Sequence, residues 1–135
     1  MVVIDSSFLI AYHNTRDVHH AAAAQVIKDL TGGVWGRALL LEYVFLEVVT
    51  VILARRGLAV ACEVATALLG AREADFVPCS EIFLDVLETF RKQGSAKLSF
   101  TDAAIVTVAR RRAGGLVATF DRDFRSIEGI SSIPA

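Results

Sequence analysis

Short, largely apolar runs that each end at an acidic residue constrain the fold of this chain most strongly. Residues 1–4 are apolar on both faces of an extended chain and rich in β-branched side chains, which predicts a short strand buried on both sides. Residues 116–120 repeat the pattern. Asp5 ends the first run and Asp121 closes the second. Strands of this kind belong to sheets that helices cover on both faces.

Helical segments separate the predicted strands along the whole chain. We expect further strands at 34–40, 75–79 and 130–133, and helices at 20–30, 41–56, 58–71, 80 or 81–93 and 99–112, with residues 6–16 forming a loop after a short helix. Gly57, Gly94 and Gly114 follow helical segments and are expected to end them. The alternation predicts a single α/β domain over residues 1–135 with a mainly parallel sheet.

Four acidic residues stand where an ordinary core would exclude them. Asp5 and Asp121 close the two apolar runs, Glu47 interrupts an apolar helix, and Asp102 opens another. A carboxylate taken out of water is costly unless it is paired or holds a cation. No basic residue lies beside Asp5 or within a helical turn of Glu47. Because sites in open α/β sheets form at the carboxyl ends of strands, we expect the four acids to gather at one edge around a divalent metal.

Glu42 competes with Glu47 for a place in this site. Five residues along a helix correspond to about 140° of rotation, so the two carboxylates cannot face the same site. Glu47 lies among apolar residues and is expected to be the more buried. Glu42 lies near a helix start, where a solvated carboxylate meets the helix dipole favourably. We therefore assign Glu47 to the site.

Local structure would also account for three of the acids without a metal. Asp5 precedes two serines and would cap the next helix. Ser99 and Asp102 have the spacing of a capping box. Turn chemistry explains an Asp121-Arg122-Asp123 sequence without any ligand.

Hydroxyl residues and a second acid lie beside the predicted ligands. Ser6 or Ser7 would hold a ligand or orient the Asp5 carboxylate, and Thr101 or Thr119 would contact a phosphate or a metal-bound water. Asp123 is the alternative to Asp121, or shares its role.

The net charge and the hydrophobic content of the chain indicate which kinds of partner it is expected to have. The net charge is −1, so no global basic field indicates nucleic acid, although a local patch would still serve. Hydrophobic residues make up 54% of the chain, which suggests apolar surface left for a dimer or another partner. No stretch approaches the roughly 18 uninterrupted apolar residues of a spanning helix, and no signal peptide fits the N-terminus. We expect no membrane association.

Cysteine and histidine give no sign of a zinc site or a disulfide. Cys62 and Cys79 form no Cys-x-x-Cys motif, and we expect both to be reduced core residues of a cytoplasmic protein. The histidines, at 13, 19 and 20, lack a zinc-ligand spacing. Three consecutive arginines, at 110–112, suit the negative end of a helix, and a nucleic-acid patch is the alternative interpretation.

The motifs around the four acids, taken in order, resemble those of PIN-domain nucleases, and most of all the VapC-type toxins of prokaryotic toxin–antitoxin pairs. The resemblance covers essentially the whole chain. The two most specific stretches are Ser99-Phe100-Thr101-Asp102-Ala103-Ala104-Ile105 and Thr119-Phe120-Asp121-Arg122-Asp123-Phe124.

This resemblance implies a three-layer α/β/α sandwich around a short parallel sheet. It further implies a Mg²⁺- or Mn²⁺-dependent endoribonuclease that forms a homodimer and is inhibited by a small antitoxin. By the resemblance, Asp5 and Asp102 are the primary metal ligands, and Glu47 and Asp121 complete the quartet. Hard oxygen ligands suit Mg²⁺ or Mn²⁺ independently of the resemblance.

Three other functions fit parts of the same pattern. One is a PIN-like RNA-processing nuclease that is not a toxin. Another is a phosphatase with Asp5 as the covalent nucleophile, although the usual second acid two residues later is Ser7 here. The third is a non-catalytic module with a structural metal.

Overall fold

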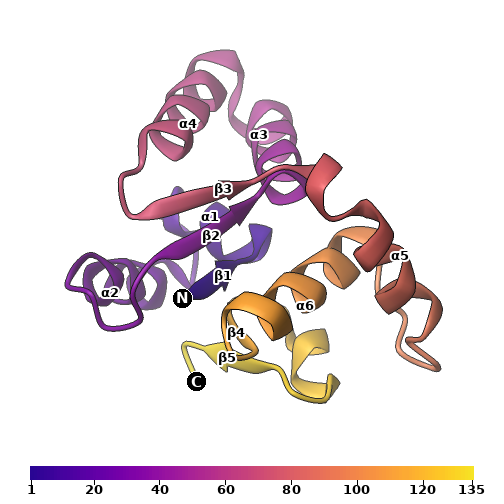
Figure 1. The fold of residues 1–135 in the computed structure, drawn as a ribbon. Helices are drawn as coiled ribbons and strands as arrows, with labels where there is room; N and C mark the ends of the chain where they lie inside the picture. The colour runs from indigo at the N-terminus through magenta and orange to yellow at the C-terminus, as the bar shows by residue number, and fades with distance from the viewer.

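The computed structural model describes residues 1–135 as a five-stranded sheet with helices on both faces (Figure 1). The spatial order of the strands is β3-β2-β1-β4-β5, and every neighbouring pair is parallel. This confirms the α/β class, with a sheet that is parallel throughout. The strands are β1 (Val2–Ile4), β2 (Ala38–Leu41), β3 (Ala74–Val77), β4 (Leu116–Ala118) and β5 (Ser131–Ile133).

Six α-helices form the outer layers of the predicted three-layer sandwich. Helix α5 packs on α6, while α1 contacts both α2 and α3, and α3 contacts α4. Figure 1 shows α5 and α6 together on one side of the sheet, with α2 and α4 apart from them. The helices are α1 (Ser6–Tyr12), α2 (His20–Thr31), α3 (Glu42–Arg56), α4 (Leu58–Gly70), α5 (Phe83–Arg91) and α6 (Phe100–Arg112).

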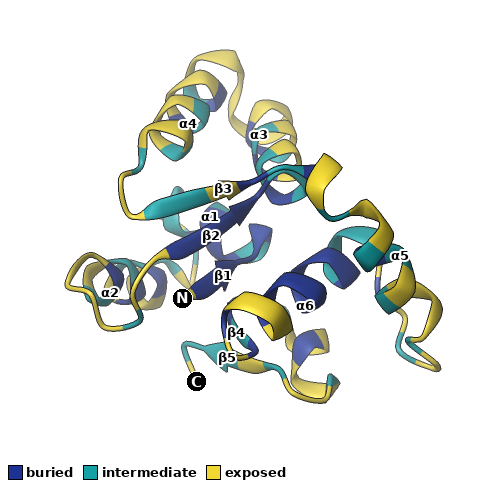
Figure 2. Ribbon diagram, in the orientation of Figure 1, coloured by how far each residue is buried: buried dark blue, intermediate teal, exposed yellow.

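Helix α6 is the most deeply buried helix. All seven residues from 103 to 109 are buried, and Figure 2 shows this stretch in dark blue. Three of them, Ala103, Ala104 and Ala109, are small and allow the helix axis to approach its neighbours closely. The one polar residue in the stretch, Thr107, donates its hydroxyl to the Ala103 carbonyl at 2.7 Å, so no polar group is left unpaired there. The helix therefore gives Asp102, near its amino end, a rigid support.

Two predicted element boundaries are wrong for identifiable reasons. Strand β2 begins at Ala38 rather than at residue 34, because Gly33 and Gly36 adopt positive φ angles of 84° and 77° that interrupt an extended chain. The predicted helix from 80 or 81 to 93 is divided into a 3₁₀ turn, η1 (Cys79–Glu81), and the shorter α5. The turn follows Pro78, which stands directly after the end of β3.

The two cysteines differ from the prediction and from each other. Cys79 is buried as expected, and burial together with the charge of Glu42 raises the pKa of its thiol. Cys62 is exposed, so its assignment to the core is wrong. Helix α4 buries only Ala61 and Val64, and Cys62, which follows Ala61, points away from that buried face.

No helix is both long and apolar enough to cross a membrane.

Candidate active site

The site begins where the order of the strands reverses. From β1 the chain runs outward to β2 and β3, and then returns through α5 and α6 to place β4 on the other side of β1. Ile4 pairs with Ala118, and the amide of Asp5 donates to the Ala118 carbonyl at 2.9 Å. Asp5 and Thr119 therefore lie side by side at the carboxyl edge. In parallel sheets, such a reversal leaves a crevice in which ligands bind.

Asp5 is a buried carboxylate held by hydroxyl groups. It is 4% exposed and has no ion-pair partner. The hydroxyls of Ser7 and Thr119 each donate to its Oδ2 atom at 2.7 Å. Its Oδ1 atom has only the Ser6 hydroxyl, at a long 3.5 Å. One oxygen is thus anchored in the protein while the other keeps its capacity to bind a ligand.

Ser7 and Thr119 also fix the chain that leads to Asp121. The Thr119 hydroxyl accepts from the Asp121 amide at 2.9 Å, and the Ser7 hydroxyl accepts from the Phe120 amide at 3.0 Å. The two hydroxyl oxygens lie 3.2 Å apart. Although Asp5 occupies the position before α1, its side chain makes no capping hydrogen bond, so the alternative interpretation of Asp5 as a helix cap is wrong.

All four predicted acids line one open cavity of about 610 Å³. It is bounded by the ends of β1 and β4, by the first turns of α1 and α6, and by one face of α3. Two of the predicted supporting residues, Ser6 and Thr101, are part of the lining, whereas Asp123 is exposed and lies outside it. The lining residues are Asp5, Ser6, Ser7, Ile10, Glu47, Val51, Arg55, Ser99, Thr101, Asp102 and Asp121.

Glu47 faces the cavity and Glu42 does not, but the expectation that Glu47 is the more buried of the two is wrong. Glu47 lines the cavity, whereas Glu42 points elsewhere and accepts a hydrogen bond from the Cys79 amide at 3.0 Å. Glu47 is nevertheless exposed and Glu42 only partly so. The cavity is an open surface feature, so a helix face that lines it remains in contact with water.

The four carboxylates influence one another electrostatically. Partial desolvation, followed by the charge of Asp5, raises the pKa of Glu47; the nearby Ser6 hydroxyl opposes this rise, and the charge of Asp102 adds to it. Burial also raises the pKa of Asp102 against the hydrogen bonds from Ser99, and the charges of Asp5 and Asp121 contribute further. Mutual repulsion of this kind is relieved when a cation binds among the carboxylates.

The predicted capping box at Asp102 and turn at Asp121 are both present, alongside the place of these acids in the cavity. The Ser99 hydroxyl accepts from the Asp102 amide at 3.0 Å, and the Ser99 amide donates to Asp102 Oδ2 at 3.3 Å, which completes the capping box. Asp121 Oδ1 accepts from the Asp123 amide at 2.9 Å. In each case these contacts use one carboxylate oxygen, which leaves the other without a hydrogen bond inside the protein.

Comparison with known proteins identifies the family. The model of the PIN domain family matches residues 2–130. The chain belongs to the PIN domain family. The crystal structure of Mycobacterium tuberculosis VapC20, a toxin that cleaves the sarcin–ricin loop, is similar in fold, with a TM-score of 0.80 and 22% sequence identity over 96% of this chain and 97% of that one. No curated protein sequence matches the chain.

The side chains that line the acid-lined cavity of this PIN domain are of the chemical type that binds a hard cation. The charged lining is carboxylate apart from Arg55, the remaining polar groups are hydroxyls, and neither histidine nor cysteine is present. Such oxygen donors suit Mg²⁺ or Mn²⁺ better than zinc. No three acidic side chains stand close enough together to form a ready-made metal site. The donors are therefore suitable in type and more widely spaced than a preformed site.

Arg55 lines the cavity, although the sequence predicted a role for it only at the end of its helix and none in the site. Glu47, Val51 and Arg55 are spaced four residues apart on α3, and all three line the cavity. Residues at such spacing share a helix face. The signal that places Arg55 beside the acids is therefore its spacing from Glu47 on the same helix.

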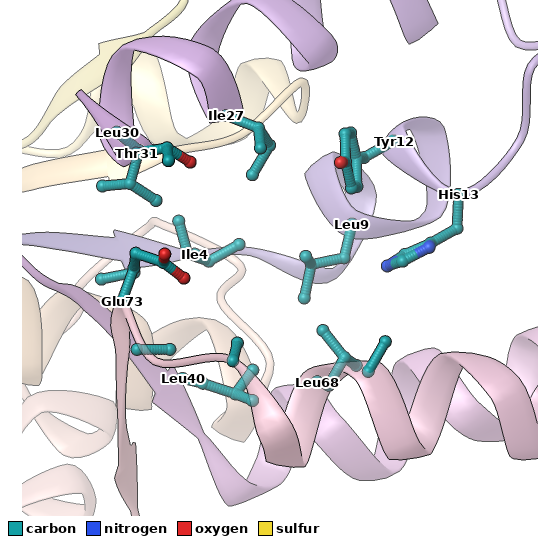
Figure 3. Close-up of a pocket in the computed structure, with 14 residues that line it drawn as sticks. Ile4, Leu9, Tyr12, His13, Ile27, Leu30, Thr31, Leu40, Leu68 and Glu73 are labelled. Atoms are coloured by element: carbon teal, nitrogen blue, oxygen red, sulfur yellow. The ribbon is translucent and has the colours of Figure 1, made fainter.

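A second cavity of this PIN domain is apolar and separate from the acids. It measures about 380 Å³ and lies between the sheet and helices α1, α2 and α4. Figure 3 shows Leu9, Ile27 and Leu68 directed toward a common space, with Glu73 at one side. None of the four predicted acids is among its lining residues. The acid-lined cavity is therefore the candidate active site.

Proposed function

We propose that this chain is a metal-dependent endoribonuclease of the VapC type, the toxin of a toxin–antitoxin pair, acting in the cytoplasm as a single PIN domain of residues 1–135. The observation that carries the proposal is the convergence of four carboxylates on one cavity, with Asp5 buried and held by two hydroxyls. Membership of the PIN family and the fold shared with a toxin that cleaves the sarcin–ricin loop support RNA as the substrate.

In this proposal, Asp5, Asp102 and Asp121 hold Mg²⁺ or Mn²⁺ and Glu47 completes the quartet. A bound ion of this kind lowers the pKa of water and stabilises the leaving oxygen of a phosphodiester. Asp5 offers its Oδ1 atom, because Oδ2 is already occupied by hydroxyl donors. Glu47 and Asp102 both have raised pKa values, and Glu47, which is not assigned to the metal, is the carboxylate suited to accept a proton from the attacking water.

The hydroxyl groups have positioning roles in this proposal. Thr119 holds the Asp5 carboxylate and the Asp121 amide together. Ser6 and Thr101 line the cavity, where their hydroxyls would contact a substrate phosphate or a water bound to the metal. Asp123 contributes its amide to Asp121 rather than a carboxylate to the cavity.

The test is cleavage of a long single-stranded RNA by purified protein with Mg²⁺, with Mn²⁺ or with EDTA. We expect metal-dependent cleavage that Asp102→Asn and Glu47→Gln each reduce by about 100-fold or more, since even neighbours of metal ligands commonly contribute 10–100-fold. Matched controls are Asp29→Asn and Glu63→Gln, which neutralise acids on α2 and α4 outside the cavity. Unimpaired cleavage by the Asp102→Asn protein would show that the site is wrongly assigned.

Further outcomes of the same experiment distinguish the remaining functions. Metal binding with a large rise in melting temperature but no RNA turnover favours the non-catalytic module. A trapped phospho-aspartate at Asp5 favours the phosphatase, in which Ser7, here a donor to Asp5, replaces the usual second acid. Cleavage without growth inhibition in cells favours an RNA-processing nuclease that is not a toxin.

The proposal includes a homodimer and an antitoxin. Large apolar side chains are exposed on α3, α4 and the edge strand β3, among them Leu53 at 47% and Phe76 at 45%. We expect light scattering to give a dimer mass that Leu53→Glu reduces to the monomer, whereas Val18→Glu, at a position 88% exposed between α1 and α2, leaves it unchanged. A dimer that persists in the Leu53→Glu protein would exclude this surface.

The antitoxin is expected to be the product of a small open reading frame directly upstream. Co-expression of that product should restore growth to cells that produce this chain. Growth inhibition that no neighbouring gene relieves would contradict a toxin–antitoxin pair.

A further inference from the structure

A basic cleft adjoins the acid-lined cavity. It measures about 520 Å³ and is lined by residues of α1, the loop after it and the end of α3. Ile10 and Arg55 line both hollows, so the two are continuous along the surface. The lining of the basic cleft consists of Ile10, Asn14, Thr15, Arg16, Ile52, Arg55 and Arg56.

The charge of this cleft is opposite to that of its neighbour. Three arginines and no acid line it, in a chain whose net charge is −1. Arg16 and Arg55 are exposed and take part in none of the ion pairs of the structure. Arg56 donates to the carbonyl of His13, which fixes its guanidinium against the α1–α2 loop. Guanidinium groups without carboxylate partners are suited to phosphate.

We infer that the basic cleft binds the phosphates of the RNA chain next to the scissile bond. This inference rests on the proposed function and extends it to the path of the substrate. From Glu47 to Arg55 the chain advances eight residues along α3, about 12 Å. That length corresponds to roughly three to four stacked nucleotides at about 3.4 Å each. Arg55 stands at the junction, where the strand would leave the acids and enter the cleft.

The lining indicates contact with the RNA backbone rather than with the bases. It contains no aromatic side chain on which a base would stack. Its polar groups besides the arginines are Asn14 and Thr15, which are neutral and small. Phosphate contacts position a nucleic acid and carry no sequence information by themselves. The cleft should therefore raise the affinity for single strands of different sequence by similar factors.

The experiment measures binding of a short fluorescent single-stranded RNA by anisotropy, in EDTA so that no metal-dependent cleavage occurs. The plot of log affinity against log salt concentration falls with increasing salt, and each phosphate contact makes it steeper by about 0.7. At 0.1 M salt, relative to 1 M, this corresponds to about fivefold in affinity. We expect Arg16→Gln and Arg55→Gln each to lower the slope by about 0.7 and to weaken binding about fivefold. Arg55→Lys keeps the charge and should largely preserve the slope.

Arg72→Gln is the matched control. Arg72 is exposed and precedes β3, at the amino edge of the sheet and away from both hollows. Slopes for Arg16→Gln and Arg55→Gln equal to that of Arg72→Gln would overturn the inference. Binding of a polyglutamate peptide in place of RNA would overturn it as well, by making the cleft a site for acidic peptides.

The same variants separate this inference from the proposed nuclease. A reduced slope in the arginine variants, with no cleavage by the unmodified protein in Mg²⁺ or Mn²⁺, would support the cleft and remove the nuclease. Metal-dependent cleavage with unchanged slopes would support the nuclease and remove the cleft. Circular dichroism melting curves of each variant confirm that a lost interaction does not reflect lost folding.

Discussion

Replacing Thr119 by valine removes one hydroxyl and almost no volume, and it tests how the acid-lined cavity is held together. The hydroxyl is buried, donates to Asp5 Oδ2 at 2.7 Å and accepts from the Asp121 amide at 2.9 Å. A hydrogen bond to a charged group contributes about 1.5–3 kcal/mol, and an unpaired buried amide costs about 1 kcal/mol or more. Ser7 remains as a donor to Asp5. We therefore expect a loss of about 2–3 kcal/mol in the free energy of unfolding.

Thr119→Ser provides the contrasting change. It keeps the hydroxyl and loses one methyl group, which corresponds to about 1 kcal/mol. If hydrogen bonding to the two acids dominates, the serine variant must be more stable than the valine variant although valine matches the shape better. Thr66→Val is the control, because Thr66 is exposed and its hydroxyl donates only to a carbonyl within its own helix.

The assay is urea unfolding at pH 7 in EDTA. With a slope of about 1.5 kcal/mol per molar urea, Thr119→Val should lower the midpoint by about 1.3–2 M and Thr119→Ser by about 0.7 M. Thr66→Val should stay within about 0.5 kcal/mol of the unmodified protein. A valine variant as stable as the Thr66→Val control, or more stable than Thr119→Ser, would refute the reasoning.

Three further predictions concern other parts of the molecule. Gly115→Ala should destabilise the protein by about 3 kcal/mol or more in urea unfolding, because its φ is +84° and a Cβ atom would lie 1.9 Å from the Gly129 carbonyl oxygen; a loss under about 0.5 kcal/mol would contradict this. In EDTA, Glu47→Gln should raise the melting temperature at pH 7, because the raised pKa of Glu47 means that its ionised form destabilises the folded state. The gain should vanish as the pH falls below the ordinary pKa of 4.5, where Glu47 is protonated in both the folded and the unfolded chain. A variant less stable than the unmodified protein at pH 7 would count against this. Asp121→Asn should reduce RNA cleavage far more than Asp123→Asn, since only Asp121 lines the cavity; the reverse order would reassign the fourth acid.

Local patterns in the sequence were sufficient for most of the fold. The buried strands β1 and β4 and the long helices α3 and α6 were predicted within a few residues, because apolar runs, glycine stops and the Ser99 cap are all local signals. The start of β2 was misplaced because the apolar residue Val34 lies between glycines, and it is 64% exposed. The positive φ angle of a glycine such as Gly36 cannot be inferred from hydrophobicity.

The gathering of the four acids in one cavity was predictable from the sequence, and the geometry of that cavity was less so. Each acid stood out against apolar neighbours, and an α/β sheet collects such residues at one edge. The contact between Ser7 and Thr119 joins residues 112 positions apart, and no local pattern specifies it. The exposure of Glu47 was also missed, because apolar neighbours in the sequence do not reveal that α3 borders an open cavity.

Because β1 pairs with β4, the acid-lined cavity can form only after β4 has been synthesised. Asp5 leaves the ribosome well before its partner Thr119, which follows 114 residues later. Until β4 has emerged and inserted beside β1, Asp5 lacks one of its two short hydrogen bonds and Asp121 is absent. Contacts between residues so distant in sequence form late in folding, because closing the long loop carries an entropic cost. A chain interrupted before β4 therefore carries Asp5 without the complete cavity, so β4 must be translated before the site exists.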